Sequence, residues 1–406
     1  MTFAWNNAWR AVVFLWAAFF LAYMSRQAVS STFAGLRADL GFTEAQLGLV
    51  GAVFLWTYAV INPLAGLMGD RMHKPTLLSA SLVLWAGAVA LMGAAWSPVA
   101  LLAGRAALAL AQGLYAPTAV AFISQIHGPA SRATAITAHA TAQYAGVIAG
   151  GWYGGAGSES FGWRWMFFSL AMVTVLYAGV LRFALRGYAA GSAAATGPRD
   201  RSPMSAIFRT VSYLAICVAF IAVCAILWIV YTWLPDLVRE RFRLSAGAAG
   251  FSGTAFVQIS MIFGLLIGAP LGDWASRKSP SGRVWVMAAG LLLSSPFVYL
   301  IVAADGLTGM KLASAGYGLF KGLFSANMWA ALLAVCAKDR STFAVGFCNS
   351  LGAVFGGVSS YMVGALKTQY PVATLFGATA VLGVVAAGVL AVAAWRYYPR
   401  DLKHED

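Results

Sequence analysis

The sequence predicts an all-α membrane protein in which twelve transmembrane helices form two related six-helix halves. Of its 406 residues, 61% are hydrophobic and only 10% are charged, and its mean hydropathy is +0.76. A soluble domain carries roughly 25% charged residues. The chain must therefore use lipid as its solvent. Long apolar runs recur through its whole length, and short motifs of the first half return in the second.

The apolar runs are long enough to cross a bilayer, for which a helix needs about 20 residues. The first run begins at Trp9 and is too long for the apolar core of a signal peptide, so it is interpreted as the first span. In chain order, the predicted spans are 9–34, 46–68, 76–96, 98–124, 133–156, 163–185, 210–235, 246–271, 284–304, 310–337, 342–366 and 371–396.

The basic residues between these spans predict the orientation of the protein. If the N-terminus is cytoplasmic, 17 Lys and Arg lie in cytoplasmic segments and only 7 lie in external ones. Cytoplasmic loops carry such an excess in membrane proteins. We therefore expect both termini in the cytoplasm, in a bacterial inner membrane. The formal net charge of +14 is then mostly a topology signal, and it does not indicate a nucleic-acid partner.

The cysteines and histidines provide no pattern of metal or disulfide chemistry. Cys217, Cys224, Cys336 and Cys348 all lie in or beside apolar spans, without the spacing of a metal site or a disulfide framework. We expect buried thiols, no metal and no cofactor.

Two halves are separated by a small, basic, Gly- and Pro-bearing stretch that is typical of a flexible linker. We assign residues 1–186 to the first bundle, 187–209 to a cytoplasmic linker and 210–406 to the second bundle. Gly69-Asp70 after the second span and Gly272-Asp273 after the eighth lie 203 residues apart, half the chain length. Duplicated halves with a site at the midplane are a recurrent plan of transporters.

The loop after the second span carries a recognisable motif. "GLMGDRMHKP" at 66–75 resembles the loop signature of the major facilitator superfamily, although Met72-His73-Lys74-Pro75 replaces its expected Gly-Arg-Lys end. "FGWRWMFF" at 161–168 resembles the entry to the sixth span in the same superfamily. The resemblance covers the whole chain and implies a carrier that works by alternating access. We expect the motif residues to form a conformational latch, namely Gly69, Asp70, Arg71, Asp273 and Arg277.

Three basic residues lie well inside predicted spans, away from their ends: Arg26, Arg105 and Lys321. A charge near the bilayer centre costs about 2.5–3.5 kcal/mol on the translocon scale, so it indicates a function. None of the thirteen acidic residues lies near the middle of a span. An anion from outside, or water in a cavity, must then compensate these charges, and we expect Arg26 to be an anion receptor. Arg105 lies nearer a span end and could instead reach backbone carbonyls or the interface.

Uncharged polar residues at similar depth complete the predicted binding site. Gln112 and Gln258 are two such polar residues. Side chains of this kind often join helices rather than bind ligands. His139 and Gln143, like Tyr58 and Asn62, are four apart and share a helix face. The predicted substrate-binding residues are Arg26, Lys321, Tyr115, His139, Gln143, Tyr58, Asn327, Asn349 and Arg105.

The first span is also similar to two anion-handling branches of the superfamily. "YMSRQAVSSTFAGLRADLGFTEAQLG" resembles the organophosphate:phosphate antiporters and the anion:cation symporters, in which an arginine late in the first span contacts the substrate anion. Arg26 occupies that position. Ser25 and Tyr115 stand where several symporters carry proton-binding carboxylates, which weakens the case for such coupling. Leu227 stands where the antiporters carry a second arginine, and we expect Lys321 to supply that charge.

The sequence therefore predicts a secondary transporter of small organic anions, either carboxylates or phosphate esters. We expect substrate to sit between the halves, exchange with a counter-anion to be favoured, and the protein to be a monomer in the lipid bilayer. Symport with H⁺ or Na⁺ is the alternative, with His139 as the titrating group. Efflux of amphipathic drugs comes third. A receptor that senses anions without moving them is the alternative from another class, and no residue pattern indicates an enzyme.

Overall fold

The computed structural model describes residues 7–188, 205–337 and 340–402, and within these it leaves the side chains of 62–71, 205–206 and 342 undescribed. The expected latch residues Gly69, Asp70 and Arg71 lie in that part of a helix, so their side chains are outside the described residues. Most of the expected linker, 187–209, is also outside them. Throughout the described ranges, the regular structure is helical and contains no strand.

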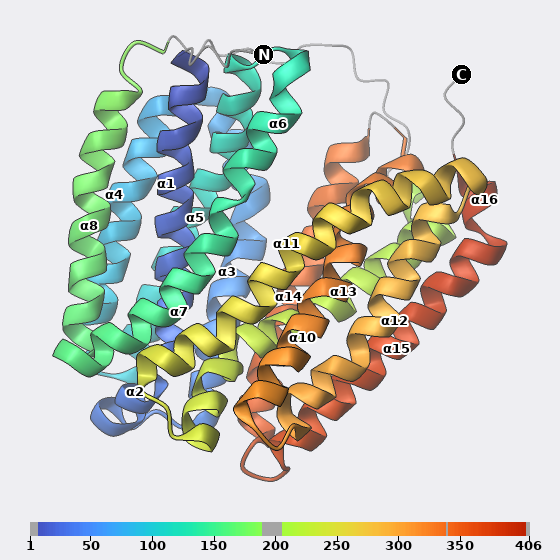
Figure 1. Cartoon of the computed structure of the whole chain (residues 1–406). Helices are drawn as coiled ribbons and strands as arrows, with labels where there is room; N and C mark the ends of the chain where they lie inside the picture. The colour runs from blue at the N-terminus through green and yellow to red at the C-terminus, as the bar shows by residue number, and fades with distance from the viewer. Residues whose placement is uncertain (1–6, 189–204, 338–339, 403–406) are drawn as a thin grey trace. The chain divides into compact units, whose positions relative to one another are not determined.

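The first half is a series of long helices (Figure 1). Helix α1 continues through a 3₁₀ turn, η1, into the short helix α2, so the first span is followed by one more helical segment. The fifth expected span is divided at Thr141 into α6 and α7. The bounds are α1 Asn7–Ala28, η1 Val29–Thr32, α2 Phe33–Leu40, α3 Glu44–Arg71, α4 Lys74–Gly93, α5 Pro98–Ile126, α6 Pro129–Ala140, α7 Ala142–Phe161 and α8 Trp163–Ala184.

The second half repeats this series after the short helix α9. Its first two long helices extend beyond the apolar runs that predicted them, because their ends are polar but still helical. The bounds are α9 Ser205–Phe208, α10 Val211–Phe242, α11 Ala246–Lys278, α12 Gly282–Ala303, α13 Leu307–Ala334, α14 Ser341–Leu366, α15 Val372–Arg396 and α16 Tyr398–Asp401.

Each of the twelve expected spans coincides with a long helix or, for the fifth, with a pair of helices. By length and hydropathy, 10 helices in the described part of the chain could cross a membrane. The two expected spans outside that set are the fifth, which is interrupted at Thr141, and the tenth, α13, which carries Lys311 and Lys321. The all-α fold is confirmed, whereas the count of twelve rests on the correspondence of helices.

Local signals in the sequence explain several of the helix ends. Ser97 caps α5, because its Oγ accepts a hydrogen bond of 3.2 Å from the amide of Ala100, and Pro98 follows in the first turn. These are the residue types preferred at a helix start. Helix α2 ends at Gly41, whose φ of 64° is in the left-handed region that favours glycine.

The chain forms two compact units. The first contains Met1–Thr196 together with Thr232–Thr254, and the second contains Gly197–Tyr231 together with Ala255–Asp406. Within the first unit, α1 packs against α7, and α4 packs against both α5 and α8 (Figure 1). Within the second, α12 packs against α13 and α15. The end of α10 and the beginning of α11 thus belong to the first unit, although the sequence assigns 210–406 to the second bundle.

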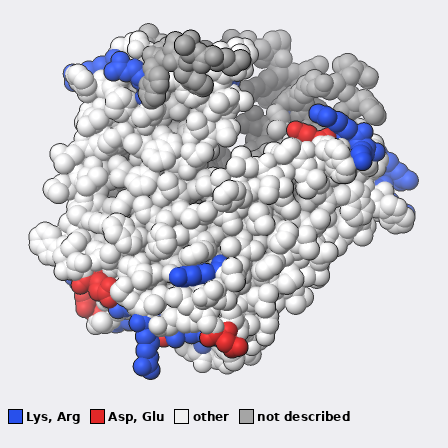
Figure 2. Space-filling view, in the orientation of Figure 1, with Lys and Arg blue, Asp and Glu red and all other residues white. Residues whose placement is uncertain are grey.

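The surface suits a lipid solvent. In Figure 2, charged side chains gather near the helix ends, and the area between them is almost entirely uncharged. Large apolar side chains are exposed on the helices, among them Trp395 (76%), Phe183 (72%) and Leu312 (67%). Exposed apolar area of this extent marks a surface that contacts lipid.

Candidate functional site

Arg26 lies in the last turn of α1, just before the helix tightens into η1. It is 9% exposed. Its Nε and Nη2 atoms donate to Oε1 of Gln112 on α5 over 3.3 and 3.2 Å. Among the side chains that the structure describes, no carboxylate forms a salt bridge with it. Its charge is therefore held by a neutral amide.

Aromatic rings surround the Arg26 guanidinium. Its Cζ lies 4.4 Å from the ring centre of Tyr23, 4.5 Å from that of Phe54 and 5.2 Å from that of Tyr58. Each cation–π contact contributes about 0.5–2 kcal/mol, more where water is excluded. The rings stabilise the cation without cancelling its charge. Nε and Nη2 both donate to one oxygen of Gln112, and a guanidinium has five N–H donors, so donors remain for a ligand.

Arg105 on α5 forms hydrogen bonds with backbone carbonyl groups. It is 2% exposed, its Nε donates to the carbonyl oxygen of Val50 over 3.0 Å, and its Nη1 donates to that of Arg26 over 3.3 Å. Its guanidinium also lies 4.9 Å from the ring centre of Phe54, the ring that contacts Arg26. Of the two roles that the sequence allows, these bonds favour the structural one, because Arg105 fixes the main chain that carries Arg26.

One face of α5 binds the backbone of α1 at three levels. Arg105 bonds to the carbonyl of Arg26, Gln112 Nε2 to that of Ala22 over 3.1 Å, and the Tyr115 hydroxyl to that of Leu15 over 2.8 Å. Buried polar groups require such partners. Tyr115, expected to bind substrate, uses its hydroxyl to join helices.

His139 lies in the last turn of α6, next to the interruption of the fifth span. Its ring is 2% exposed and stacks on Phe19 with 4.5 Å between ring centres. Thr141, which separates His139 from Gln143, accepts a hydrogen bond of 2.9 Å from Trp16 Nε1 through its Oγ1. His139 lies at the end of α6 and Gln143 at the beginning of α7, and Thr141 between them keeps helical dihedral angles (φ −62°, ψ −24°).

Lys321 lies within the second unit, on α13, and is 4% exposed. Its Nζ is 3.2 Å from Sδ of Met261 on α11. The neighbouring glycines allow helices to approach one another: a Cβ at Gly322 would meet Gly264 at 2.6 Å, and one at Gly318 would meet the backbone of Val257. These glycines bring α11 against Lys321, whereas the sequence left open whether they admit a helix or a ligand.

The remaining candidates of the second unit have different surroundings. Asn327 is fully buried and donates through Nδ2 to the carbonyls of Gly268 (2.8 Å) and Leu323 (3.0 Å). Asn349 lies on α14 and is exposed. Arg283 pairs with Asp273 over 2.5 Å and donates to Asn327 over 3.3 Å. The partner of Asp273 is thus Arg283, and the expected latch residue Arg277 lies in the last turn of α11.

The structure brings Arg26, Arg105 and Tyr58 together around Phe54. Tyr23 and Phe54 are not among the residues predicted from the sequence. Both could have been found from helical spacing, since Tyr23 is three residues before Arg26 and Phe54 is four before Tyr58, and such pairs share a face. In the described residues, no group of His, Cys, Asp and Glu could hold a metal ion.

The family profile described as "Major Facilitator Superfamily" matches residues 15–360. The chain belongs to the Major Facilitator Superfamily. It is therefore an integral membrane transporter, and it is not an enzyme.

Other proteins of the superfamily are similar to this one over most of its length. The protein spinster of Drosophila melanogaster is 25% identical over 389 residues, and the match covers 89% of this chain but only 62% of that longer protein. A probable sulfoacetate transporter of Cupriavidus necator is 27% identical over 373 residues, covering 86% of this chain and 84% of the relative. The crystal structure of a bacterial homologue of the human lysosomal transporter Spinster matches with a TM-score of 0.85 at 16% identity, over 99% of this chain and 100% of that one. This last likeness concerns the fold.

Proposed function

We propose that this protein carries small organic anions across the membrane by alternating access, with Arg26 as the group that binds the anion. The observation that supports this most directly is the environment of Arg26, where a buried guanidinium meets an amide and three aromatic rings. A buried charge without a counter-ion is strongly unfavourable. An anionic substrate relieves that penalty when it binds, which gives the site its selectivity.

Lys321 is the second base in this proposal. It is buried and contacts a thioether sulfur, which is a weak acceptor for an ammonium group. An arginine offers carboxylate or phosphate a bidentate fork, and a lysine offers a point charge. Either base therefore suits a cargo that carries an anionic group. The relative from Cupriavidus necator is named as a probable sulfoacetate transporter, and this name supports an organic anion as the cargo.

Exchange follows from the same electrostatics. Among the described residues, neither Arg26 nor Lys321 forms a salt bridge with a carboxylate, so without a bound anion the conformational change of an empty carrier is disfavoured. Bound anion removes that penalty in either direction. We propose that the protein exchanges anions. We also propose that it spans a bacterial inner membrane, with both termini in the cytoplasm.

The test is counterflow in proteoliposomes loaded with candidate carboxylates, sulfonates and phosphate esters. Arg26→Gln should lower the exchange rate by at least about tenfold, the loss expected for one charge-assisted hydrogen bond. Arg26→Lys should retain part of the activity, since it keeps the charge but loses the fork. Arg186→Gln, at an exposed base, is the control and should be unchanged. Normal exchange by folded Arg26→Gln protein would refute the proposal.

Coupling to protons is a second candidate because of His139. Its ring is buried, and within the described residues its Nε2 has no hydrogen-bond partner. An imidazole can carry a proton near neutral pH. Uptake driven by an imposed proton gradient, and lost in His139→Ala, would favour symport over exchange.

A further inference from the structure

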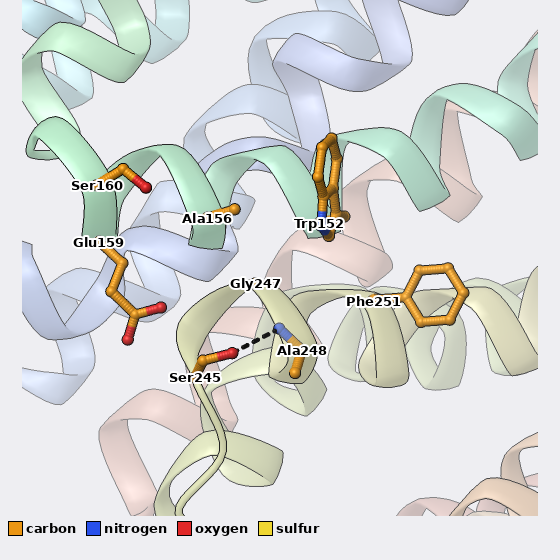
Figure 3. A pocket seen from close by; sticks show the side chains of 8 residues that line it. All are labelled: Trp152, Ala156, Glu159, Ser160, Ser245, Gly247, Ala248 and Phe251. Carbon is orange, nitrogen blue, oxygen red and sulfur yellow. Dashed lines mark hydrogen bonds between the residues drawn. The ribbon is translucent and has the colours of Figure 1, made fainter.

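A groove between the end of α7 and the beginning of α11 has no role in the transport mechanism above. It has a volume of about 560 Å³. Its residues all belong to the first unit. Figure 3 shows Glu159 and Ser245 at one end, Trp152 and Phe251 at the other, and the small residue Gly247 between them.

The groove exists because the two helices approach closely beneath it. A Cβ at Gly250 of α11 would collide with the carbonyl oxygen of Gly151 on α7, so the backbones touch there. Small residues form the floor, since a Cβ at Gly247 would lie only 3.0 Å from that of Ala156. The walls are larger, and Trp152 and Phe251 are 52% and 41% exposed.

Polarity changes along the groove in the direction expected for the edge of a membrane. Glu159 lies in the last turn of α7, and Ser245 precedes the first turn of α11. Trp152 is about 10 Å further along α7 and Phe251 about 9 Å further along α11, at 1.5 Å per residue. A lipid whose acyl chain lies along the two aromatic rings would therefore have its headgroup at the carboxylate end.

The charged end has groups of both signs. Glu159 also lines an adjoining cavity of about 360 Å³, together with Arg239 and Asp39. Asp39 accepts a hydrogen bond of 2.7 Å from Trp163. Glu159 accepts one of 3.0 Å from the amide of Ala246 through Oε2. A ligand that matches this end carries a hydrogen-bonding cation beside an anion.

We propose that the groove binds a lipid with a phosphoethanolamine headgroup. The primary ammonium contacts Glu159, the phosphate turns toward Arg239, and an acyl chain lies along Trp152 and Phe251. A trimethylammonium headgroup fits less well because it has no N–H to donate. A lipid with an anionic glycerol headgroup fits less well because it meets Glu159 with no cation.

The test measures lipid binding to the purified full-length protein, without reference to transport. Protein in detergent is titrated with phosphatidylethanolamine, phosphatidylcholine and phosphatidylglycerol of equal chain length, and bound lipid is counted by native mass spectrometry. The wild-type protein should retain phosphatidylethanolamine in preference to both others. Equal retention of the three lipids, or a preference for phosphatidylglycerol, overturns the proposal.

Variants assign the preference to this groove. Glu159→Gln keeps an acceptor oxygen for the amide of Ala246, so α11 stays capped, but it should reduce the preference for phosphatidylethanolamine about tenfold. Arg239→Gln should weaken retention as well, and Trp152→Leu should weaken retention of all three lipids. Asp305→Asn, at an exposed acid of the second unit, is the control. An unchanged preference in folded Glu159→Gln and Arg239→Gln protein excludes this site.

Discussion

The side chain of Gln112 contacts both the guanidinium of Arg26 and the backbone of α1, the helix that carries Arg26. Its Oε1 accepts from the guanidinium at 3.2 Å, and its Nε2 donates to the carbonyl of Ala22 at 3.1 Å, one turn earlier on α1. The amide is thereby fixed in one orientation, with its oxygen toward the cation. Arg26 is positioned but keeps its full charge.

Gln112→Glu should convert this positioned cation into an internal ion pair. The carboxylate would take the place of the substrate anion beside Arg26, so substrate affinity should fall by at least about tenfold, or about 1.4 kcal/mol. The apparent melting temperature should hold or rise, because the buried charge is then paired. Binding is measured by quenching of tryptophan fluorescence and stability by a thermal melt.

Gln112→Leu tests the loss of the amide at the same position without adding a negative charge. It removes the orienting amide and adds no anion, so it should lower both affinity and melting temperature. Undiminished anion binding by Gln112→Glu would contradict the role given to Arg26, because a guanidinium paired with a carboxylate is a poor receptor.

Arg105→Gln should damage the fold more than the chemistry. The shorter side chain leaves the carbonyls of Val50 and Arg26 without their donor, and each buried unsatisfied group costs about 1–3 kcal/mol. We expect a lower melting temperature and less monodisperse protein on size-exclusion chromatography. Exchange per folded molecule should fall only severalfold. A fully stable Arg105→Gln protein that no longer binds anions would instead show that Arg105 contacts substrate.

The sequence identifies Arg26, Arg105 and Tyr58 as candidate binding residues, because a charge inside a span and helical spacing can both be recognised from the sequence alone. It does not predict which of them meet. The pairing of Gln112 with Arg26 depends on how α5 is rotated and shifted against α1, and many registers satisfy the same hydropathy. The backbone roles of Arg105 and Tyr115 depend on the same packing, since a carbonyl acceptor leaves no trace in the sequence.

The second half shows a related limit. Repetition of Gly-Asp identifies Asp273, but Arg277 and Arg283 are both near it in sequence, and only the turn between α11 and α12 brings Arg283 within 2.5 Å. The glycines around Lys321 indicate that another group approaches closely, but they do not distinguish a helix from a ligand. Helix–helix contact and ligand access need the same small residues.

Lys321→Met should stabilise the protein and abolish exchange. The ammonium is 4% exposed and meets Sδ of Met261, so an uncharged side chain of similar length removes a desolvation penalty. Replacement of buried charges by apolar residues is often stabilising, by about 1–4 kcal/mol. Lys311→Met, at the fifth residue of the same helix, is the control. A destabilised Lys321→Met protein would show that the lysine supports the fold.

Arg37 on α2 is surrounded by three carboxylates of the first unit. It contacts Glu44 at 2.7 Å, Asp236 at 2.5 Å and Glu240 at 3.6 Å. The side chain of Asp236 is only 3% exposed. This guanidinium therefore joins α2 to the end of α10 and balances three carboxylates, in contrast to Arg26, which faces none among the described residues.

Arg37→Met should be more destabilising than the loss of a surface ion pair. It leaves the three carboxylates to repel one another, and removal of one partner from a buried pair costs about 3–5 kcal/mol. A thermal melt of Arg37→Met, Asp236→Asn and the double variant forms a double-mutant cycle. The double variant should recover part of the loss, because Asp236 then has no charge to compensate. Strict additivity would mean that the 2.5 Å contact contributes nothing of its own and that Arg37 acts through Glu44 or Glu240.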